Sequence, residues 1–240
     1  MTGPTEGLRA LKKRRTRLAI SHTATRLFLE RGFDKVTIAE IAEAAGVAKM
    51  TVTNYFPRKE DLALDVHEEF VAWPAATVRD RAPGESALAA LRRAYLDAVD
   101  RREAMIGFSG EPFARLVAGS PTLVARVREL HEERERALAK ALAEATGDAT
   151  GDATGEPIGK ATGTGEGTGE EAGTGVAGLG ARLAAAQVGG VHRVLFEEAQ
   201  RHAADGRTHE EIAAALTEAA GRAFGLLEPS LGGYAVRTDE

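Results

Sequence analysis

Residues 37–59, TIAEIAEAAGVAKMTVTNYFPRK, read as two short helices joined by a tight turn. Thr37 with Glu40 three positions later forms a capping box, in which the threonine oxygen accepts a backbone N–H and the glutamate reaches back to the cap residue. Gly46 adopts a left-handed conformation at little cost and therefore ends the first helix. A second helix over residues 48–56 follows directly, so the stretch predicts a helix-turn-helix.

The second of these helices has two inward-facing residues, Val52 and Phe56, which leave most of its other side chains outside. The outward set is Lys49, Met50, Thr51, Thr53, Asn54 and Tyr55. Lysine and hydroxyl groups bind phosphates, and an asparagine amide can pair with a base edge. A helix-turn-helix places such a helix in the DNA major groove. The alternative is an ordinary helical hairpin with a solvated polar face.

The net charge of −5 conceals a strong asymmetry along the 240 residues. Residues 1–60 hold 12 Lys and Arg against 6 Asp and Glu, whereas residues 61–240 hold 19 against 30. A positive local patch is sufficient to steer a protein toward DNA even when the whole chain is acidic. We therefore expect a basic, DNA-binding head on an acidic body.

The composition restricts the class of protein further. The chain has no cysteine, so we expect no disulfide framework, no cysteine-ligated metal and a cytoplasmic location. Its N-terminus lacks the apolar region of a signal peptide, and it contains no apolar run of about 18 residues that would span a membrane. Aromatic residues make up only 5% of an alanine-rich chain, and the helical periodicity predicts an all-α fold.

A basic cluster precedes the helix-turn-helix and leads into a helix predicted over residues 13–31. The cluster consists of Arg9, Lys12, Lys13, Arg14, Arg15 and Arg17. Beside a DNA-binding motif we expect this cluster, Arg14 and Arg15 in particular, to contact phosphates. A solvated, flexible tail is the alternative, because charge runs are often only solvated.

Residues 26–62, RLFLERGFDKVTIAEIAEAAGVAKMTVTNYFPRKEDL, resemble the DNA-binding domain of the TetR family of transcriptional regulators. The resemblance rests on the ERGF segment, the IA-x-x-AGV turn and the YFPRKEDL segment, and it covers residues 13–65. It implies an all-α protein with an N-terminal three-helix helix-turn-helix domain and a C-terminal helical ligand-binding and dimerisation bundle. It also implies phosphate contacts from Thr37, Thr51, Tyr55 and Lys59, and contacts to bases or the nearby backbone from Lys49, Met50, Thr53 and Asn54.

Three residues depart from the pattern of that family. Ala48 stands where Ser or Thr is usual, so the recognition helix lacks a side-chain cap worth about 1 kcal/mol. Thr53 replaces a common tyrosine, and Arg58 replaces a small polar residue. These departures leave the operator sequence open.

We expect four parts along the chain: a disordered basic arm (1–12), the DNA-binding domain (13–60), a helical body (61–228) and a loose tail (229–240). The first body helix is expected over residues 60–72, with a kink or break at Trp73-Pro74, because proline disfavours helix at the residue before it. Further helices are expected over residues 85–101, 121–145, 181–204 and 208–227. Residues 146–180 carry a short A-T-G-D repeat and much glycine, which predicts a flexible acidic insert.

The body is expected to enclose an apolar ligand pocket between its helices. Candidate lining residues are Phe70, Trp73, Tyr95, Met105, Phe108, Phe113, Leu116, His131, His192 and Phe196. Each of them is as readily explained as ordinary core. The last two helices have broad apolar faces with small residues, and we expect them to pair with a second copy through Val188, Leu195, Ile212, Leu216, Ala219, Ala223 and Phe224. The alternative is that these faces pack only within one subunit.

The sequence contains no catalytic or metal-binding constellation that stands out. The six histidines are scattered, without the spacing of a metal site, so we expect no metal and no cofactor. Arg134 and Arg136 lie among glutamates in a segment that reads as a solvated helix face. A helical enzyme that carries a DNA-binding head is therefore disfavoured.

These features predict a sequence-specific transcriptional regulator, a repressor released from DNA by an unknown small-molecule effector. As a homodimer it would bind a palindromic operator in double-stranded DNA. Ligand binding would shift the first body helix and change the spacing of the two recognition helices. An activator or dual regulator on the same fold, or a ligand-independent architectural DNA protein, is the alternative.

Overall fold

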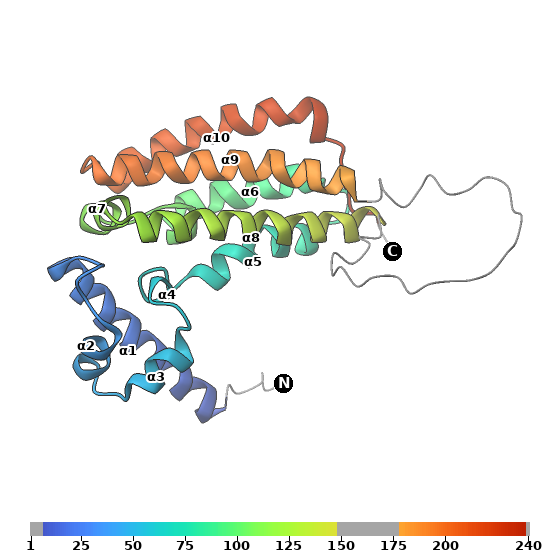
Figure 1. The fold of residues 1–240 in the computed structure, drawn as a ribbon. Helices are drawn as coiled ribbons and strands as arrows, with labels where there is room; N and C mark the ends of the chain where they lie inside the picture. Colours follow the sequence, from blue (N-terminus) through green and yellow to red (C-terminus); the bar gives the residue numbers. More distant parts are fainter. Residues whose placement is uncertain (1–6, 148–177, 239–240) are drawn as a thin grey trace, which may run out of the picture.

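The computed structural model describes residues 7–147 and 178–238, apart from the side chains of Leu8 and Arg9. All regular structure in these residues is helical, which confirms the predicted all-α fold. The N-terminal helices form a head that lies below a layered body made of the later helices (Figure 1). The helices are α1 (Leu8–Arg31), α2 (Ile38–Ala44), α3 (Lys49–Tyr55), α4 (Glu60–Ala63), α5 (His67–Asp80), α6 (Ala87–Asp100), the short 3-10 helix η1 (Ala104–Ile106), α7 (Glu111–Gly119), α8 (Pro121–Thr146), α9 (Leu179–Ala204) and α10 (His209–Leu231).

The head is a three-helix core with the predicted helix-turn-helix in it. The capping box before α2 is present: the Thr37 N–H donates to Glu40 Oε2 at 2.8 Å, and the Glu40 N–H donates to Thr37 Oγ1 at 3.3 Å. Gly46 has φ +66°, as the tight turn requires. Val52 and Phe56 are fully buried, as the periodicity of the second helix predicted. Thus local sequence signals alone fix this part of the head.

Helix α1 is longer than we predicted. It begins at Leu8 rather than residue 13, with Gly7 as its N-cap. Residues 8–12 of the arm expected to be disordered therefore form the first turns of a helix, while residues 1–6 lie outside the described part of the chain. Basic side chains of that arm, such as Lys12, consequently have a fixed direction relative to α3.

The predicted first body helix over residues 60–72 is wrong in its position. Helix α4 ends after one turn, at Ala63, and α5 continues without interruption past Pro74. Contacts to α1 hold the chain at this break, because Ser21 donates to the Asp65 carboxylate and Arg17 Nη2 donates to Asp65 O at 3.4 Å. Proline removes only one N–H from α5, and its ring is buried in the body. Tertiary packing therefore overrides the local preference of proline.

The body is a bundle in which α8 packs against α5 and α9, and α10 packs against α9 and α6. Figure 1 shows α8, α9 and α10 running side by side. The apolar core between these helices includes Leu91, Tyr95, Leu138, Leu216 and Phe224, each of which is nearly inaccessible to solvent. The predicted glycine-rich insert lies between α8 and α9, and most of it falls outside the described residues.

The C-terminal residues are not loose, contrary to our expectation for residues 229–240. Helix α10 runs through Pro229 to Leu231. Beyond it, the Gly84 N–H donates to Arg237 O at 2.8 Å and the Arg237 N–H donates to Glu85 O at 3.1 Å. Two reciprocal backbone bonds hold the segment to the loop before α6, up to the last described residue, 238.

Head and body share a continuous apolar contact. Val117 of α7 and Leu123 of α8 belong to the same buried cluster as Phe28 and Phe33 of the head. Helix α1 packs directly against α7, and α4 against α8. The position of the head is therefore coupled to the packing of the body helices.

Candidate DNA interface and effector pocket

The outward face of α3 is available to a partner. Lys49, Met50 and Asn54 are exposed, with Met50 at 70% of its full accessibility, while Tyr55 is half-buried. Ala48 is the N-cap of α3, and its methyl side chain forms no capping hydrogen bond, as we predicted from its residue type. A short helix with exposed polar ends, held by two buried residues, can enter a DNA groove without changing the head.

The threonine hydroxyls that we predicted to contact DNA differ in whether they already form hydrogen bonds within the head. Thr53 Oγ1 donates to Met50 O at 3.1 Å, so its proton is directed back to the helix. Thr51 is half-buried, on the same helix. Thr37 Oγ1 donates to Glu40 Oε2 at 2.8 Å inside the capping box. The predicted roles of these three residues toward DNA therefore stay predictions, and the hydroxyls of Thr37 and Thr53 would have to exchange an internal bond for a phosphate.

Basic residues of α1 lie beside the end of the recognition helix. A surface hollow of about 620 Å³ is lined by Lys12, Lys13, Thr16 and Tyr55, among others. Arg14 and Arg15 are exposed on the same helix. Since Tyr55 follows the positions that we predict to read bases, this arrangement places a cluster of positive charge where we expect the recognition helix to meet a phosphate backbone.

Arg17 differs from the other members of the basic cluster discussed here because its guanidinium is bound within the head. Its Nη1 donates to Tyr55 O at 2.9 Å, and its guanidinium lies 4.4 Å from the centre of the Phe56 ring. The bond satisfies a carbonyl at the end of α3. Arg17 therefore anchors the recognition helix to α1, a role that its place in a charge run did not indicate.

Lys59 is also bound within the head. Its Nζ donates to Phe33 O at 2.6 Å and lies 4.3 Å from the centre of the Phe33 ring. Partial burial lowers the pKa of Lys59, against smaller opposing effects of Asp34, Glu60 and Glu40. An ammonium has three N–H donors, so two are left for the phosphate that we predicted for this residue.

A buried ion pair joins the head to the body. Arg126 Nε of α8 donates to Asp61 Oδ1 of α4 at 3.0 Å, and Arg126 Nη1 reaches Glu133 at 2.9 Å. Arg58 extends the network at the surface, through Glu129 at 2.6 Å. We did not predict this network from the sequence. One sequence feature could have indicated that Arg126 is buried: it lies four residues before Leu130, which is buried, and hence on the same face of the helix.

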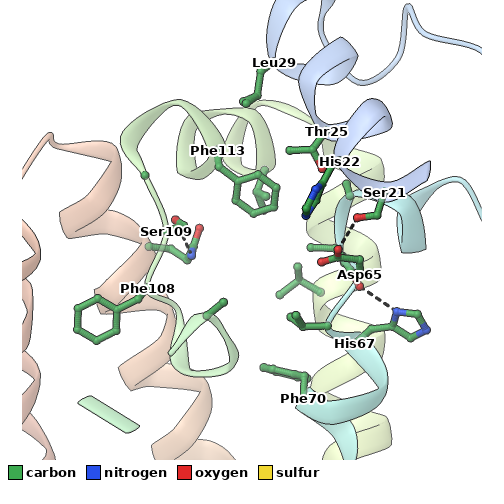
Figure 2. A pocket seen from close by; sticks show the side chains of 18 of the residues that line it. Ser21, His22, Thr25, Leu29, Asp65, His67, Phe70, Phe108, Ser109 and Phe113 are labelled. Carbon is green, nitrogen blue, oxygen red and sulfur yellow. Dashed lines mark hydrogen bonds between the residues drawn. The ribbon is translucent and has the colours of Figure 1, made fainter. Parts of the chain in front are cut away.

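An apolar cavity with a volume of about 760 Å³ lies at the junction of head and body. Figure 2 shows Ser21, His22, Thr25 and Leu29 of α1 on one side, facing Phe108, Ser109 and Phe113. The other walls come from the loop between α4 and α5, with Asp65, and from α5, α8 and α9. A molecule in this cavity would therefore touch the DNA-binding head and the body at once.

The residues that we predicted to line a ligand pocket fall into two groups with respect to this cavity. Four predicted residues line it: Phe70, Phe108, Phe113 and Phe196. Six do not: Trp73, Tyr95, Met105, Leu116, His131 and His192. The reason is packing: Trp73, Tyr95 and Met105 belong to the body core, Leu116 packs on the head core, and His192 is 2% exposed. His131 lines a second hollow of about 460 Å³ between α7, α8 and α9.

The α1 wall was missed because the sequence assigns α1 to DNA binding alone. Residues His22, Thr25 and Leu29 continue the polar and half-exposed side of an amphipathic helix. Nothing in their spacing shows that α7 lies opposite them. The cavity is a property of how two domains pack, and it could not be read from either one.

The predicted dimer residues need a similar correction. Five of the seven are buried inside the subunit: Val188, Leu195, Ile212, Leu216 and Phe224, none more than 2% exposed. They fill the core between α6, α9 and α10 and have no surface for a partner, while Ala219 and Ala223 are half-buried. The apolar residues that do face outward on these two helices include Leu183 at 55%, Val194 at 49% and Leu226 at 80%.

The described residues were also compared with the requirements of a membrane-spanning helix and of a metal site. No helix in residues 7–147 or 178–238 is both long enough and apolar enough to cross a membrane. Within the same residues, no three His, Asp or Glu side chains gather where they could hold a metal ion.

Comparisons with known proteins agree with the geometry of the head. Residues 20–66 match a family model described as bacterial regulatory proteins of the tetR family. The chain is 34% identical over 143 residues to TcmR of Streptomyces glaucescens, an HTH-type transcriptional regulator. That alignment covers 56% of this chain and 62% of the relative, so the chain spans about 62% of the length of the curated protein it matches.

A comparison with solved structures also gave matches. A putative TetR-family regulator from Mesorhizobium loti is 19% identical with a TM-score of 0.47, covering 90% of this chain and 98% of that one. NalD of Pseudomonas aeruginosa is 18% identical with a TM-score of 0.49, covering 88% and 96%. With the family match over the helix-turn-helix and the sequence identity to TcmR, the head of this chain is similar to the DNA-binding domain of the tetR family of bacterial regulatory proteins.

Proposed function

We propose that this protein is a sequence-specific, DNA-binding transcriptional regulator, a repressor that binds a palindromic operator as a homodimer and is released by a small-molecule effector. One observation carries the proposal. The exposed face of α3, with Lys49 and Asn54, lies beside the basic start of α1, with Lys12 and Lys13. Such a protein acts on chromosomal DNA, and we place it in the cytoplasm for that reason.

The two sides of this surface have different tasks. Asn54, with the exposed Lys49 and Met50, faces the base edges, since an asparagine amide matches adenine and a lysine matches guanine. The residues around the hollow at Tyr55, together with Arg14 and Arg15, meet phosphates and set the register. The first set carries sequence preference, and the second carries affinity that falls with salt.

Dimerisation is proposed through the outward faces of α9 and α10. Leu226 is 80% exposed and Leu183 is 55% exposed, so both neighbouring helices carry free apolar side chains. A two-fold pairing of these helices would bury both copies of each residue. Light scattering on Leu226→Glu, with the exposed Leu18→Glu on α1 as its control, tests the interface. We expect a monomer for the first variant and a dimer for the second.

The effector step is proposed for the cavity at the junction of head and body. Its walls include α1 on one side and Phe70 and Phe196 on the other, so occupancy changes the distance between them. A ligand shifts DNA affinity only by its different affinity for the two head positions. The broken connection between α4 and α5, held to α1 through Asp65, is the segment that would move.

Two alternatives use the same surface. TcmR is named a transcriptional regulator without a stated sign, so an activator on this fold is one of them. A ligand-independent architectural DNA protein is the other, and the 760 Å³ cavity argues against it.

The proposal is tested by selection from a pool of randomised duplexes with the full-length protein at physiological salt. We expect one enriched motif with two inverted half-sites, about one helical turn apart. Enrichment of no motif would overturn the proposal. A motif without inverted symmetry would overturn its dimeric form.

A further inference from the structure

The body contains a buried arginine that the fold leaves without a counter-ion. Arg134 of α8 is 4% exposed, although its charged neighbours predicted a solvated face. Among the described residues, no group hydrogen-bonds its Nε or Nη2, and no Asp or Glu oxygen lies within 4 Å of it. Its spacing explains the burial, because Arg134 lies four residues from both Leu130 and Leu138 on the inner face of α8.

Further buried polar atoms without partners surround this guanidinium. In the described part of the chain, the Tyr95 hydroxyl and Nε2 of both His131 and His192 have no hydrogen-bond partner. The Tyr95 and His192 rings stack with their centres 5.9 Å apart, and Trp73 lies 5.6 Å from His192. Side chains of α6, α8 and α9 thus present unpaired polar atoms near Arg134, and none of those named here supplies a negative charge.

The charge state of the cluster follows from burial. Burial lowers the pKa of His131 to about 3 and that of His192 well below its ordinary value, with the charge of Arg134 adding to both shifts. Burial also lowers the pKa of Arg134, to about 9, which still leaves it protonated at neutral pH. The cluster therefore carries one positive charge beside neutral histidines and a neutral phenol.

Cation–π contacts account for only part of this arrangement. The guanidinium carbon lies 4.6 Å from the centre of the Phe70 ring and 5.1 Å from that of Trp73. These contacts stabilise the charge through the ring faces. They leave the N–H donors in the guanidinium plane unpaired, and buried donors of this kind are otherwise paired in native proteins.

The cluster adjoins the cavity between head and body. Phe70 and Phe196 line that cavity, and their ring centres lie 5.6 Å apart. His131 lies 5.0 Å from Phe70 and 5.2 Å from Phe196. Figure 2 shows Phe70 at the border of the cavity. Arg134 is therefore separated from the cavity by one aromatic side chain, which can turn about its own bonds.

We propose that Arg134, with Tyr95 and His192, forms an anion-binding extension of the effector pocket that opens when Phe70 turns aside, and that it takes the carboxylate of an aromatic acid whose rings lie against Phe70 and Phe196. This inference rests on the proposed effector step. A carboxylate fits because its two oxygens match the planar fork of a guanidinium. One negative charge also balances the single positive charge of the cluster, whereas a phosphate dianion would leave a buried excess. The apolar aromatic wall selects the remainder of the ligand.

The test uses full-length protein and calorimetry with a panel of biphenyl, naphthalene and anthracene carboxylic acids, each paired with its neutral carboxamide. We expect at least one acid to bind about tenfold or more tightly than its amide, as a charge-assisted hydrogen bond requires. Arg134→Met should abolish this preference, and Arg134→Lys should keep part of it. Arg136→Met, on the exposed side of the same helix, is the matched control and should keep it fully.

A second measurement separates the proposal from a purely structural role. Ligand-free Arg134→Met should unfold at the same or a higher temperature than the wild type, since it loses an unpaired buried charge. A wild-type preference that survives in Arg134→Met, or no preference for any acid in the panel, would overturn the anion site. DNA binding by ligand-free Arg134→Met should equal that of the wild type. Loss of sequence-specific DNA binding by the wild type is a different outcome, and it would contradict the proposed function instead.

Discussion

Arg126 Nε donates to Asp61 Oδ1 at 3.0 Å, with the two side chains only 8% and 6% exposed. The pair joins α8, the central helix of the body, to α4, the single turn that follows the recognition helix. Glu133 and Glu129 share the same guanidinium. The ion pair therefore connects α8 to the head directly, in addition to the chain between α4 and α5.

Removing the charge of Asp61 should weaken the fold markedly. Asp61→Asn leaves Arg126 buried with one counter-charge fewer, and we expect the free energy of unfolding to fall by about 3 kcal/mol, the low end for a broken buried pair, because Glu133 still contacts the arginine. Urea denaturation measures the change. Arg58→Gln is the control, since its pair with Glu129 is half-exposed and worth about 0–1 kcal/mol. Equal effects of the two variants would show that the Asp61 pair does not hold the domains together.

The two helices of the helix-turn-helix should respond oppositely to changes at their caps. Thr37 caps α2 through its side chain, and Ala48 provides no such cap for α3. Ala48→Ser should raise the free energy of unfolding by about 1 kcal/mol, and Thr37→Ala should lower it by about 1 kcal/mol. Thermal denaturation of both variants provides the measurement. A serine at position 48 that brings no gain would mean that the end of α3 is already satisfied in another way.

The capping box also predicts a dependence on pH. The backbone hydrogen bond from Thr37, with smaller contributions from Arg31 and the Thr37 hydroxyl, lowers the pKa of Glu40 to about 2, from its ordinary value of 4.5. A lowered pKa stabilises the fold above the ordinary value, and this contribution is lost as the pH falls from 4.5 toward 2. We therefore expect Glu40→Gln to be less stable than the wild type at pH 6 and closer to it at pH 3, in thermal melts across that range. A constant difference would contradict the assignment.

Replacing Gly46 or Gly107 by alanine should lower the free energy of unfolding by different amounts. Both have positive φ, +66° at Gly46 and +106° at Gly107, but a Cβ on Gly46 meets no atom within 4 Å. A Cβ on Gly107 would lie 2.7 Å from Ala199 Cβ. Gly46→Ala should therefore cost about 1 kcal/mol of backbone strain, and Gly107→Ala clearly more, by urea denaturation. Equal losses would mean that α9 can shift to make room beside Gly107.

The head could be predicted from the sequence because neighbouring residues determine its features. The capping box at Thr37, the turn at Gly46 and the inward pair Val52 and Phe56 are each a local pattern, and the structure confirms all of them. Local preference failed at Pro74, where packing in the body keeps the helix continuous. There the deciding contacts come from distant parts of the chain.

The site in the body was harder to predict for the same reason. The sequence supplied four of the aromatic residues around the cavity but not α1 as its wall, because no local signal tells which surfaces of two domains meet. The charged neighbours of Arg134 predicted an exposed side chain, and this prediction was wrong. The spacing of Arg134 from Leu130 and Leu138 places it on the inner face of α8 and indicates that it is buried. Hydrophobic faces likewise predicted which helices pack together but not whether Val188 and Phe224 would face their own subunit or a second one.

The central claim, that α3 reads DNA sequence, is tested most directly by fluorescence anisotropy with the selected operator and a scrambled duplex of equal length. At physiological salt we expect the wild type to prefer the operator by a factor of about 10³ or more, as specific DNA-binding proteins do. Asn54→Ala should reduce this preference at particular bases, whereas changing Tyr55 or Lys59 should weaken binding to both duplexes alike. Equal affinity of the wild type for the two duplexes would contradict the account.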